Sequence, residues 1–233
     1  MAHQSPVRSY STRFTLDESP ISEGGLWVNG RTDGIDWADV VTEGGVAHGG
    51  RTRMAVAEHR AEQGNLDPAS AAEAEPVGDY DDPTAVLAGT WGRNQHVKAT
   101  VFSRNQTEEY FQEVEIRLRS TIEPHVCTGY EVFWRCLKTD NAYAEIVRWN
   151  GVIGAWTSLA RRQGSAFGVQ HGDVVEATID GNVIRSFVNG VEVLSATDDA
   201  FATGSPGIGF NFGCGDTYID HGFTQYEVDS YDD

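Results

Sequence analysis

The feature that most constrains the fold is the alternation of apolar and polar residues from position 96 onward, broken at short intervals by Gly, Asn and Asp. Alternation with a period of two is the pattern of half-buried β-strands. Asp180-Gly181 and Asn189-Gly190 each lie between two such runs, as hairpin turns do, so residues 173–196 are predicted to form a meander. The chain is therefore predicted to be an all-β antiparallel sandwich. We predict strands at 97–104, 111–119, 129–137, 142–149, 173–180, 182–189, 191–196, 206–213 and 217–227.

The first ninety or so residues are less regular. A strand is predicted from Ser9 to Leu16, followed by glycine-rich loops. Residues 51–63 are rich in the helix formers Ala, Glu, Arg and Met and are followed by Gly64. We predict that 48–78 is an irregular insertion with one short helix. No linker or repeat divides the chain, and 233 residues suit one sandwich, so 1–233 is predicted to be a single domain.

The charge balance argues against a nucleic-acid partner. The chain has 17 basic and 35 acidic residues, a net charge of −18, which repels a phosphate backbone. No apolar run approaches the ~20 residues that cross a bilayer, so membrane insertion is not expected. The polar start Met1-Ala2-His3 lacks the order of a signal peptide. We expect either that the protein is not exported by that route or that a leader has been removed.

The three cysteines fit neither a paired disulfide framework nor a zinc spacing. Cys127 and Cys136 flank one predicted strand, and nine extended residues span about 30 Å, which forbids a bridge between them unless the chain turns back. A bridge between Cys136 and Cys214 stays open. Buried free thiols are the favoured state.

Two predicted strands present charged residues on one face. Val114, Ile116 and Leu118 point to one side of strand 111–119, and the next strand repeats the alternation. If the two strands are neighbours, their polar sides form a wet, charged floor, which in a jelly roll is commonly the concave groove. The side chains of this floor are Glu113, Glu115, Arg117, Arg119, Glu131, Phe133 and Arg135.

Glu113 and Glu115 are the candidate catalytic pair. Carboxylates two apart on a strand lie about 7 Å from each other, near the separations that glycosidases use. The simpler interpretation is that they form salt bridges with nearby arginines. A lyase would instead use a base and an arginine that neutralises a uronate, and nothing in the spacing selects such a set from Arg135, Arg148, Tyr143, His96 and His125.

Tryptophans are candidates for stacking on sugar rings, because an indole covers the apolar face of a pyranose well. Trp91, Trp134, Trp149 and Trp156 are available, and most are expected in the core. Trp149 is predicted to be partly exposed because it stands at a strand end before the Asn150-Gly151 turn.

No pair of histidines has a metal-ligand spacing, so a transition-metal site is not expected. Calcium fits better. Asp216 and Asp220, near the last strand, offer hard oxygen ligands and are the predicted calcium ligands.

Several segments resemble a concanavalin-A-like, laminin-G-like jelly-roll family of bacterial, phage and environmental sequences. The resemblance covers most of the chain outside 48–78 and implies a carbohydrate-binding or carbohydrate-active context. The glucanase branch uses an E-x-D-x-x-E strand, whereas Glu113 to Leu118 has Glu at the middle acid and lacks the last one. The similar segments are GYEVFWRC at 129–136, YAEIVRWNG at 143–151, residues 171–193, 197–210, 19–30 and 80–101.

Three functions follow as hypotheses. The first is a lectin-like module that binds a polysaccharide on the concave face through Arg117, Glu131, Arg135, Arg148 and Trp149. The second is a polysaccharide lyase or glycoside hydrolase in the same groove. The third is a virion surface or decoration protein, for which a homo-oligomer or virion assembly is expected. The fold favours an extracellular or virion-surface location.

Overall fold

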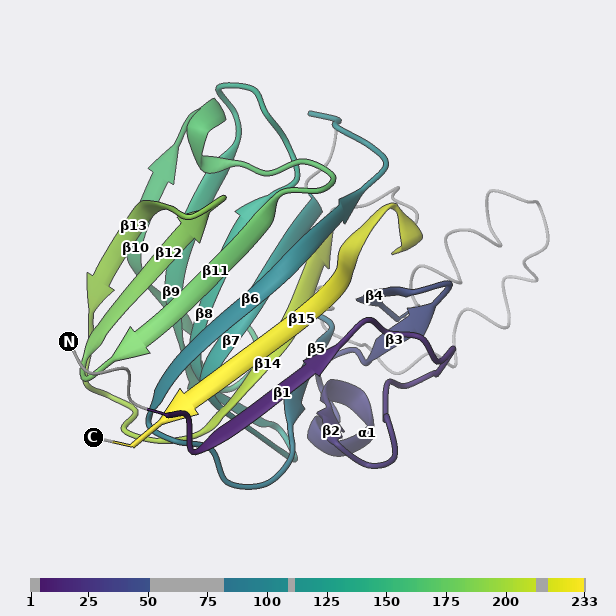
Figure 1. Ribbon diagram of the computed structural model, residues 1–233, viewed down its shortest axis with the longest axis vertical. Helices are drawn as coiled ribbons and strands as arrows, with labels where there is room; N and C mark the ends of the chain where they lie inside the picture. Colours follow the sequence, from purple (N-terminus) through teal and green to yellow (C-terminus); the bar gives the residue numbers. More distant parts are fainter. Residues whose placement is uncertain (1–4, 51–81, 109–111, 213–217, 233) are drawn as a thin grey trace, which may run out of the picture.

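The computed structural model of the protein describes residues 5–50, 82–108, 112–212 and 218–232. Within these ranges the chain is mostly strand, arranged as two antiparallel sheets in two layers (Figure 1). The predicted all-β sandwich is therefore confirmed. β1 pairs with β15, so segments near the two ends of the chain lie side by side.

The strands of the two sheets follow in spatial order. The eight-stranded sheet contains β13 (Val191–Thr197), β12 (Val183–Val188), β11 (Val174–Asp180), β6 (Asn94–Ser103), β15 (His221–Tyr231), β4 (Val46–Gly49) and β3 (Val40–Glu43), with β1 (Arg8–Thr12) beside β15. The seven-stranded sheet contains β10 (Trp156–Gln163), β9 (Tyr143–Gly151), β8 (Val126–Arg135), β7 (Gln112–Glu123), β14 (Ser205–Phe212), β5 (Thr84–Leu87) and β2 (Trp27–Asn29). Short helices are α1 (Gly30–Gly34), η1 (Ser165–Phe167) and η2 (Tyr218–Asp220).

The predicted meander is present as β11, β12 and β13. Val188 pairs with Val191 across the Asn189-Gly190 turn, and both turn residues have positive φ, 51° and 77°. This is the backbone that a type I′ turn requires and that Asn and Gly adopt at little cost. Local sequence thus sets the register of this hairpin.

Some strands were missed. The short strands β2 to β5 contain three or four residues each, too few to show alternation. The edge strand β10 has mostly exposed residues and therefore carries no apolar period. Of the predicted insertion, His48 and Gly49 belong to β4 and Gly50 follows it. The remainder, including the helix predicted at 51–63, lies outside the described residues.

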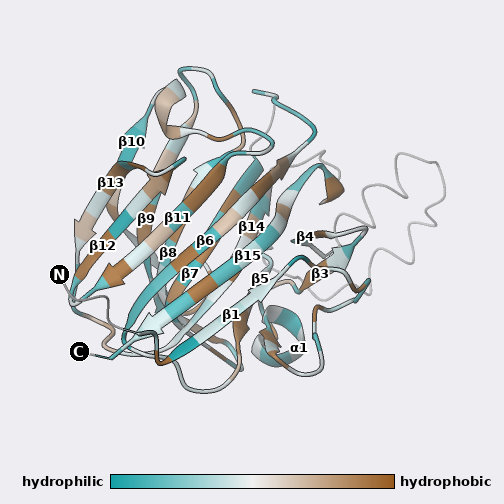
Figure 2. Ribbon diagram, viewed as in Figure 1, coloured by the Kyte–Doolittle hydropathy of each residue, from teal (hydrophilic) through white to brown (hydrophobic). Residues whose placement is uncertain are grey.

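The main core lies between the two sheets. Val97, Ala99 and Val101 of β6 face inward, as do Val114 and Ile116 of β7, and all five are at most 1% exposed. Figure 2 shows apolar positions recurring along β11, β6 and β15, as alternation requires. Burial of this apolar area is the main term that stabilises the sandwich.

A second apolar cluster covers the other side of the seven-stranded sheet. Residues 30–39 fold back over this side, where α1 contacts the end of β7 and the amide of Thr84 donates to Ala38 O at 3.1 Å. The seven-stranded sheet is thus covered on both faces over part of its area. The cluster consists of Trp37, Val86, Ile122, Cys127, Phe133, Val147 and Trp149.

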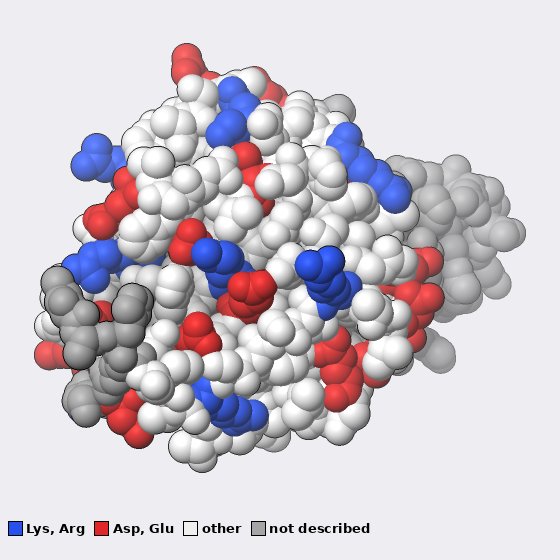
Figure 3. Space-filling model, viewed as in Figure 1, with Lys and Arg blue, Asp and Glu red and all other residues white. Residues whose placement is uncertain are grey.

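The outer face of the eight-stranded sheet carries charged side chains at the surface, unlike the covered part of the seven-stranded sheet. In Figure 3 acidic and basic side chains are interspersed on the face shown, among many uncharged ones. Among the described residues, no helix has the length and apolarity needed to cross a membrane.

Of the cysteines, Cys127 is buried and free, and Cys136 is buried. Burial raises the pKa of the Cys127 thiol to about 12, so it is protonated at neutral pH. The open question of a bridge from Cys136 to Cys214 involves a residue outside the described ranges.

Candidate functional site

The predicted charged floor exists on the outer face of the seven-stranded sheet. Its register is set by β7 and β8, which place Glu113 opposite Arg135 and Arg117 opposite Glu131. Glu115 is opposite Phe133. Because these residues alternate with core residues, they share one face, as predicted.

The expectation that this floor is wet is wrong. Glu113, Glu115, Arg117 and Glu131 are 6%, 1%, 0% and 3% exposed. They share this face with the second apolar cluster, whose Trp149 contacts both Arg117 and Glu131, so the charges lie in a region of low polarity. Charges in such a place must be paired or neutralised, because their desolvation is costly.

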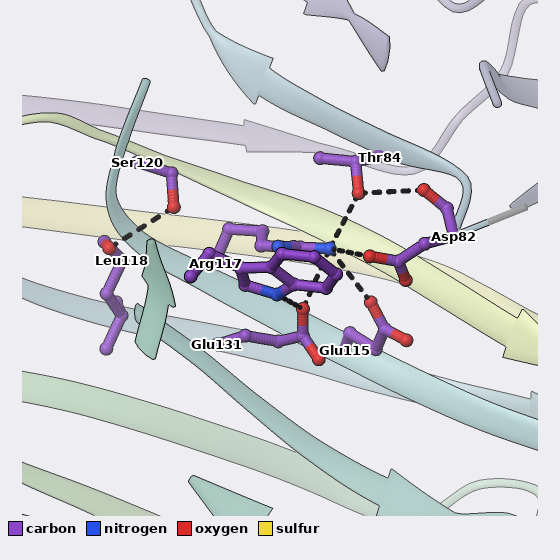
Figure 4. Close-up of polar contacts among 8 residues, drawn as sticks. Asp82, Thr84, Glu115, Arg117, Leu118, Ser120 and Glu131 are labelled. Atoms are coloured by element: carbon purple, nitrogen blue, oxygen red, sulfur yellow. Dashed lines mark hydrogen bonds and ion pairs between the residues drawn. The ribbon is translucent and has the colours of Figure 1, made fainter. Parts of the chain in front are cut away.

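Arg117 is the centre of this buried charge cluster (Figure 4). Its Nη2 lies 2.7 Å from a carboxylate oxygen of Asp82, 2.7 Å from one of Glu131 and 3.4 Å from one of Glu115. Nη2 also donates to Thr84 Oγ1 at 2.7 Å. Asp82 lies two residues before Thr84, the first residue of β5, so one short segment supplies two of the partners of Arg117.

Trp149 closes the cluster from outside. Its Nε1 donates to Glu131 Oε2 at 2.6 Å, and its ring lies 5.2 Å from the Arg117 guanidinium. Trp37 packs against it in an edge-to-face arrangement, with ring centroids 6.2 Å apart. Trp149 is only 2% exposed, so the prediction that it is partly exposed is wrong. The exposed tryptophan of this face is Trp156, at 42%.

The carboxyl groups of the cluster have raised pKa values. Burial raises the pKa of Glu113 to about 7, and burial raises that of Glu131 to about 8 although Arg117 opposes the shift. Burial and the charge of Asp82 raise the pKa of Glu115 well above its ordinary value. Burial would lower the pKa of Arg117, but Glu131 and Asp82 raise it, so the guanidinium stays charged. At neutral pH the cluster therefore combines one fixed cation with partly protonated carboxyl groups.

The carboxyl groups of this cluster have the composition of a cation site. Asp82, Glu115 and Glu131 each place a carboxylate oxygen within 4.8 Å of the others, a donor set of the kind calcium takes. The Nη2 atom of Arg117 already lies among these oxygens and supplies the positive charge. The three residues therefore fit a guanidinium rather than a metal ion.

The predicted calcium ligands lie elsewhere. Asp220 ends η2, and its carbonyl oxygen accepts a hydrogen bond from the amide of Arg104 at 2.7 Å. Asp216 lies outside the described residues. Calcium binding by this pair stays a prediction.

Beside the cluster a small cavity of about 30 Å³ opens toward solvent. This volume holds about one water molecule or one hydroxyl group. Among its lining residues, Trp156 is the exposed one and therefore marks the opening. Four carboxyl groups and several rings surround the cavity: Asp82, Glu113, Glu115, Glu131, Phe133, Val147, Trp149, Trp156 and Asn211.

The rim of this pocket is ordered by contacts between strands. The hydroxyl of Tyr143 donates to Glu113, and Arg161 forms an ion pair with the buried Glu145. The guanidinium of Arg161 also lies 4.0 Å from the centre of the Tyr143 ring. Arg135 lies 5.8 Å from the same ring. The rim thus presents an aromatic ring with two cations beside it.

Two of the predicted arginines do not join the pocket. A β-bulge after Leu118 and a positive φ of 46° turn Arg119 away, and its guanidinium donates to Phe201 O and Gly181 O. Arg148 pairs with Tyr130, whose side chain faces the core, and forms an ion pair with Asp198 at 2.6 Å. Both residues fix loops at one end of the sandwich.

The histidines considered for a lyase are also distant from the pocket. His96 lies on the eight-stranded sheet, where it contacts Glu176 at 2.9 Å. His125 contacts Asp36 at 3.0 Å in a turn between β7 and β8. Neither is placed to act as a base there.

Asp82 and Arg161 were not predicted from the sequence, and of the four candidate tryptophans Trp156, not the favoured Trp149, is the exposed one on this face. One available signal was the glycine spacing in β14. Gly207 and Gly209 lie opposite Arg117 and Glu115 on the same face. A Cβ atom on Gly209 would lie 2.2 Å from Glu115 Oε2. Gly209 therefore leaves room for the large charged side chain of Glu115 on the neighbouring strand.

The two antiparallel sheets form a sandwich with the concanavalin-A-like jelly-roll fold. No protein-family model matches the chain, and no curated protein sequence matches it. Solved structures do. The carbohydrate-binding module CBM66 from Bacillus subtilis is 11% identical with a TM-score of 0.53, over 92% of this chain and 98% of that one.

Two further structures have the same fold. The Bacillus licheniformis β-glucanase is 12% identical with a TM-score of 0.52, over 96% of this chain and 98% of that one. The exoplasmic/lumenal domain of VIP36 in its Ca²⁺/Man3GlcNAc-bound form is 10% identical with a TM-score of 0.53, over 95% and 91%. At such identities the likeness establishes the fold alone.

Proposed function

We propose that this chain is a carbohydrate-binding module whose ligand lies over the pocket on the outer face of the seven-stranded sheet. The observation that carries the proposal is the exposed indole of Trp156 beside a small polar cavity on an otherwise covered face. An exposed aromatic ring next to convergent polar groups is the usual make-up of a site for a small polar ligand.

The size of the cavity limits how a sugar binds. A volume of about 30 Å³ admits one hydroxyl group but no sugar ring. The ring therefore lies outside against Trp156, and one hydroxyl enters and donates to the carboxyl group of Glu113 or Glu115. Arg135 and Arg161 at the rim contact further hydroxyls. Arg117 acts indirectly, because it is buried beneath the Trp149 ring and does not line the cavity, whereas Glu131 lines the cavity.

The test is retention of the purified chain in affinity gels that contain plant, algal or bacterial polysaccharides, with and without calcium. Trp156→Ala is expected to lose retention, whereas Val152→Ala, a change at a 62% exposed residue of the same hairpin, is expected to keep it. Stacking of a nucleobase on an aromatic side chain is worth about 1–3 kcal/mol, and a loss of the same order, roughly five- to 150-fold in affinity, is expected here. Equal retention of the two variants would refute the proposed site.

A hydrolase is the second candidate, and the pKa of Glu113, about 7, favours it. A carboxyl group that keeps its proton near neutral pH can act as a general acid. Its partner would be Glu115, which must lose its proton to act as nucleophile or base. Burial and the charges of Asp82 and Glu131 raise the pKa of Glu115, and Arg117, 3.4 Å away, lowers it. Release of reducing ends in the same polysaccharide panel, abolished by Glu113→Gln, is the expected sign of this activity. The polysaccharide lyase and the virion decoration protein stay predictions.

A further inference from the structure

The opposite side of the sandwich has a much larger hollow than the site above. It measures about 440 Å³ and lies over β1, β15 and β6 on the outer face of the eight-stranded sheet. This size falls in the range of roughly 300–1,000 Å³ typical of small-molecule sites. Its polar lining residues are Ser9, Ser11, His96, Lys98, Glu227 and Asp229. Figure 3 shows this face, with both signs of charge present.

Strand register arranges these side chains in two parallel rows. Ser9 pairs with Asp229, which pairs with His96. Ser11, Glu227 and Lys98 form the second row in the same way. Each row thus runs from a hydroxyl through a carboxylate to a nitrogen base, and the rows lie two residues apart on the same face.

The first row has the residue types of a hydrolase triad but not its geometry. Ser9 Oγ donates to Asp229 Oδ1 at 2.5 Å, and His96 Nε2 contacts Glu176 at 2.9 Å. A nucleophilic serine needs its hydrogen bond to the imidazole, with the carboxylate behind it. Here the carboxylate lies between the other two, so the row can bind a ligand but does not activate Ser9.

The lining side chains are held in place before any ligand arrives. Asp229 is held by Ser9, and Glu227 accepts a hydrogen bond from Gln225. Lys98 Nζ lies 3.7 Å from Glu176, which also contacts His96. Lys98 and His96 remain 44% and 43% exposed. Such preorganised donors and acceptors lower the cost of binding.

From this arrangement we infer a second saccharide site in the hollow, specific for uncharged sugars, so that one chain holds two glycan strands on opposite sides of the sandwich. Sugar hydroxyls both donate and accept, so they match carboxylates on β15 together with an ammonium and hydroxyls on β6 and β1. A polyanion would meet Asp229, Glu227 and the net charge of −18. The inference rests on the proposed function, because it takes sugar as the ligand.

Binding in the hollow is expected to be weak. The ring of Tyr10 does not serve as a platform, since it packs with Trp27 and Tyr226 at centroid distances of 5.9 and 6.3 Å. A weak site gains from a polymeric ligand, because binding at one site raises the effective concentration at the other. The functional consequence is cross-linking of neutral polysaccharide by a single chain.

The experiment uses a neutral polysaccharide that retains the wild-type chain in gels, and it measures light scattering when the two are mixed in solution. The oligomeric state is measured first by size-exclusion chromatography with light scattering. Wild type is expected to increase the scattering. The double variant Lys98→Ala/Glu227→Gln is expected to scatter like the polymer alone yet stay retained in the gel, since the Trp156 site is intact.

Three outcomes would overturn the inference. Scattering by the double variant equal to wild type would show that the hollow plays no part. Retention of wild type without added scattering would leave the Trp156 site standing and remove the second one. No retention on any polysaccharide of the panel, neutral or charged, would refute both the second site and the proposed function. An unchanged Tm of the double variant is the control for folding.

Discussion

The two outer faces of the sandwich carry similar patterns in different environments. On the seven-stranded sheet, Glu115, Arg117 and Glu131 are at most 3% exposed, whereas on the eight-stranded sheet the side chains of Lys98 and His96 are more than 40% exposed. On each sheet, these charged residues alternate with core residues along neighbouring strands. Alternation therefore determines which residues share a face, while the segment that packs on that face determines its polarity.

The difference has an energetic consequence. A buried ion pair is costly to break because a partner is left charged without water, whereas an exposed pair contributes about 0–1 kcal/mol. The buried charge cluster also binds protons at neutral pH because burial raises its carboxyl pKa values. The stability of the fold should therefore depend on the seven-stranded sheet's charges far more than on those of the other sheet.

The largest effect is expected from removal of the buried cation. Arg117→Met leaves Asp82 and Glu131 without their partner and is expected to cost about 3–5 kcal/mol in unfolding free energy. Lys98→Met on the open face is the matched control and is expected to cost below about 1 kcal/mol. Urea unfolding followed by tryptophan fluorescence measures both. Equal costs would show that burial of the cluster is unimportant.

A smaller effect is expected from pH. The folded pKa values of Glu113 and Glu131, about 7 and about 8, lie above their ordinary value of 4.5. Their contribution to stability is therefore fully present below about pH 4.5 and is lost as pH rises through 7 to 8. The urea midpoint should fall between pH 5 and 9, and Glu113→Gln should make that fall shallower. A midpoint that rises over this range would contradict the assignment.

The smallest effect concerns the two tryptophans of the pocket. Trp149→Phe keeps an aromatic ring but removes the donor to Glu131, which is expected to cost about 1–3 kcal/mol. Trp156→Phe changes an exposed side chain and is expected to stay within about 0.5 kcal/mol. Thermal unfolding of the two variants measures the difference. If Trp156→Phe were the more destabilising change, the roles assigned to these residues would be reversed.

The sequence alone predicted much of the fold and part of the site. Alternation predicted the long strands, and Asn189-Gly190 predicted a hairpin, because both signals are local. It also placed Glu113, Glu115, Arg117 and Glu131 on one face. The segments similar to concanavalin-A-like proteins implied the same architecture, which the solved structures confirm as the fold.

Contacts between distant segments decided the rest. Trp37 and Asp82 come from the N-terminal part of the chain and pack on the charged face. The face that was predicted to be solvated is therefore buried. A bulge turned Arg119 away, and packing under Trp37 buried Trp149 while leaving Trp156 exposed. A period of two residues records only which side of a strand a residue faces. What covers that side is set by tertiary packing between residues far apart in sequence, and no local pattern encodes it.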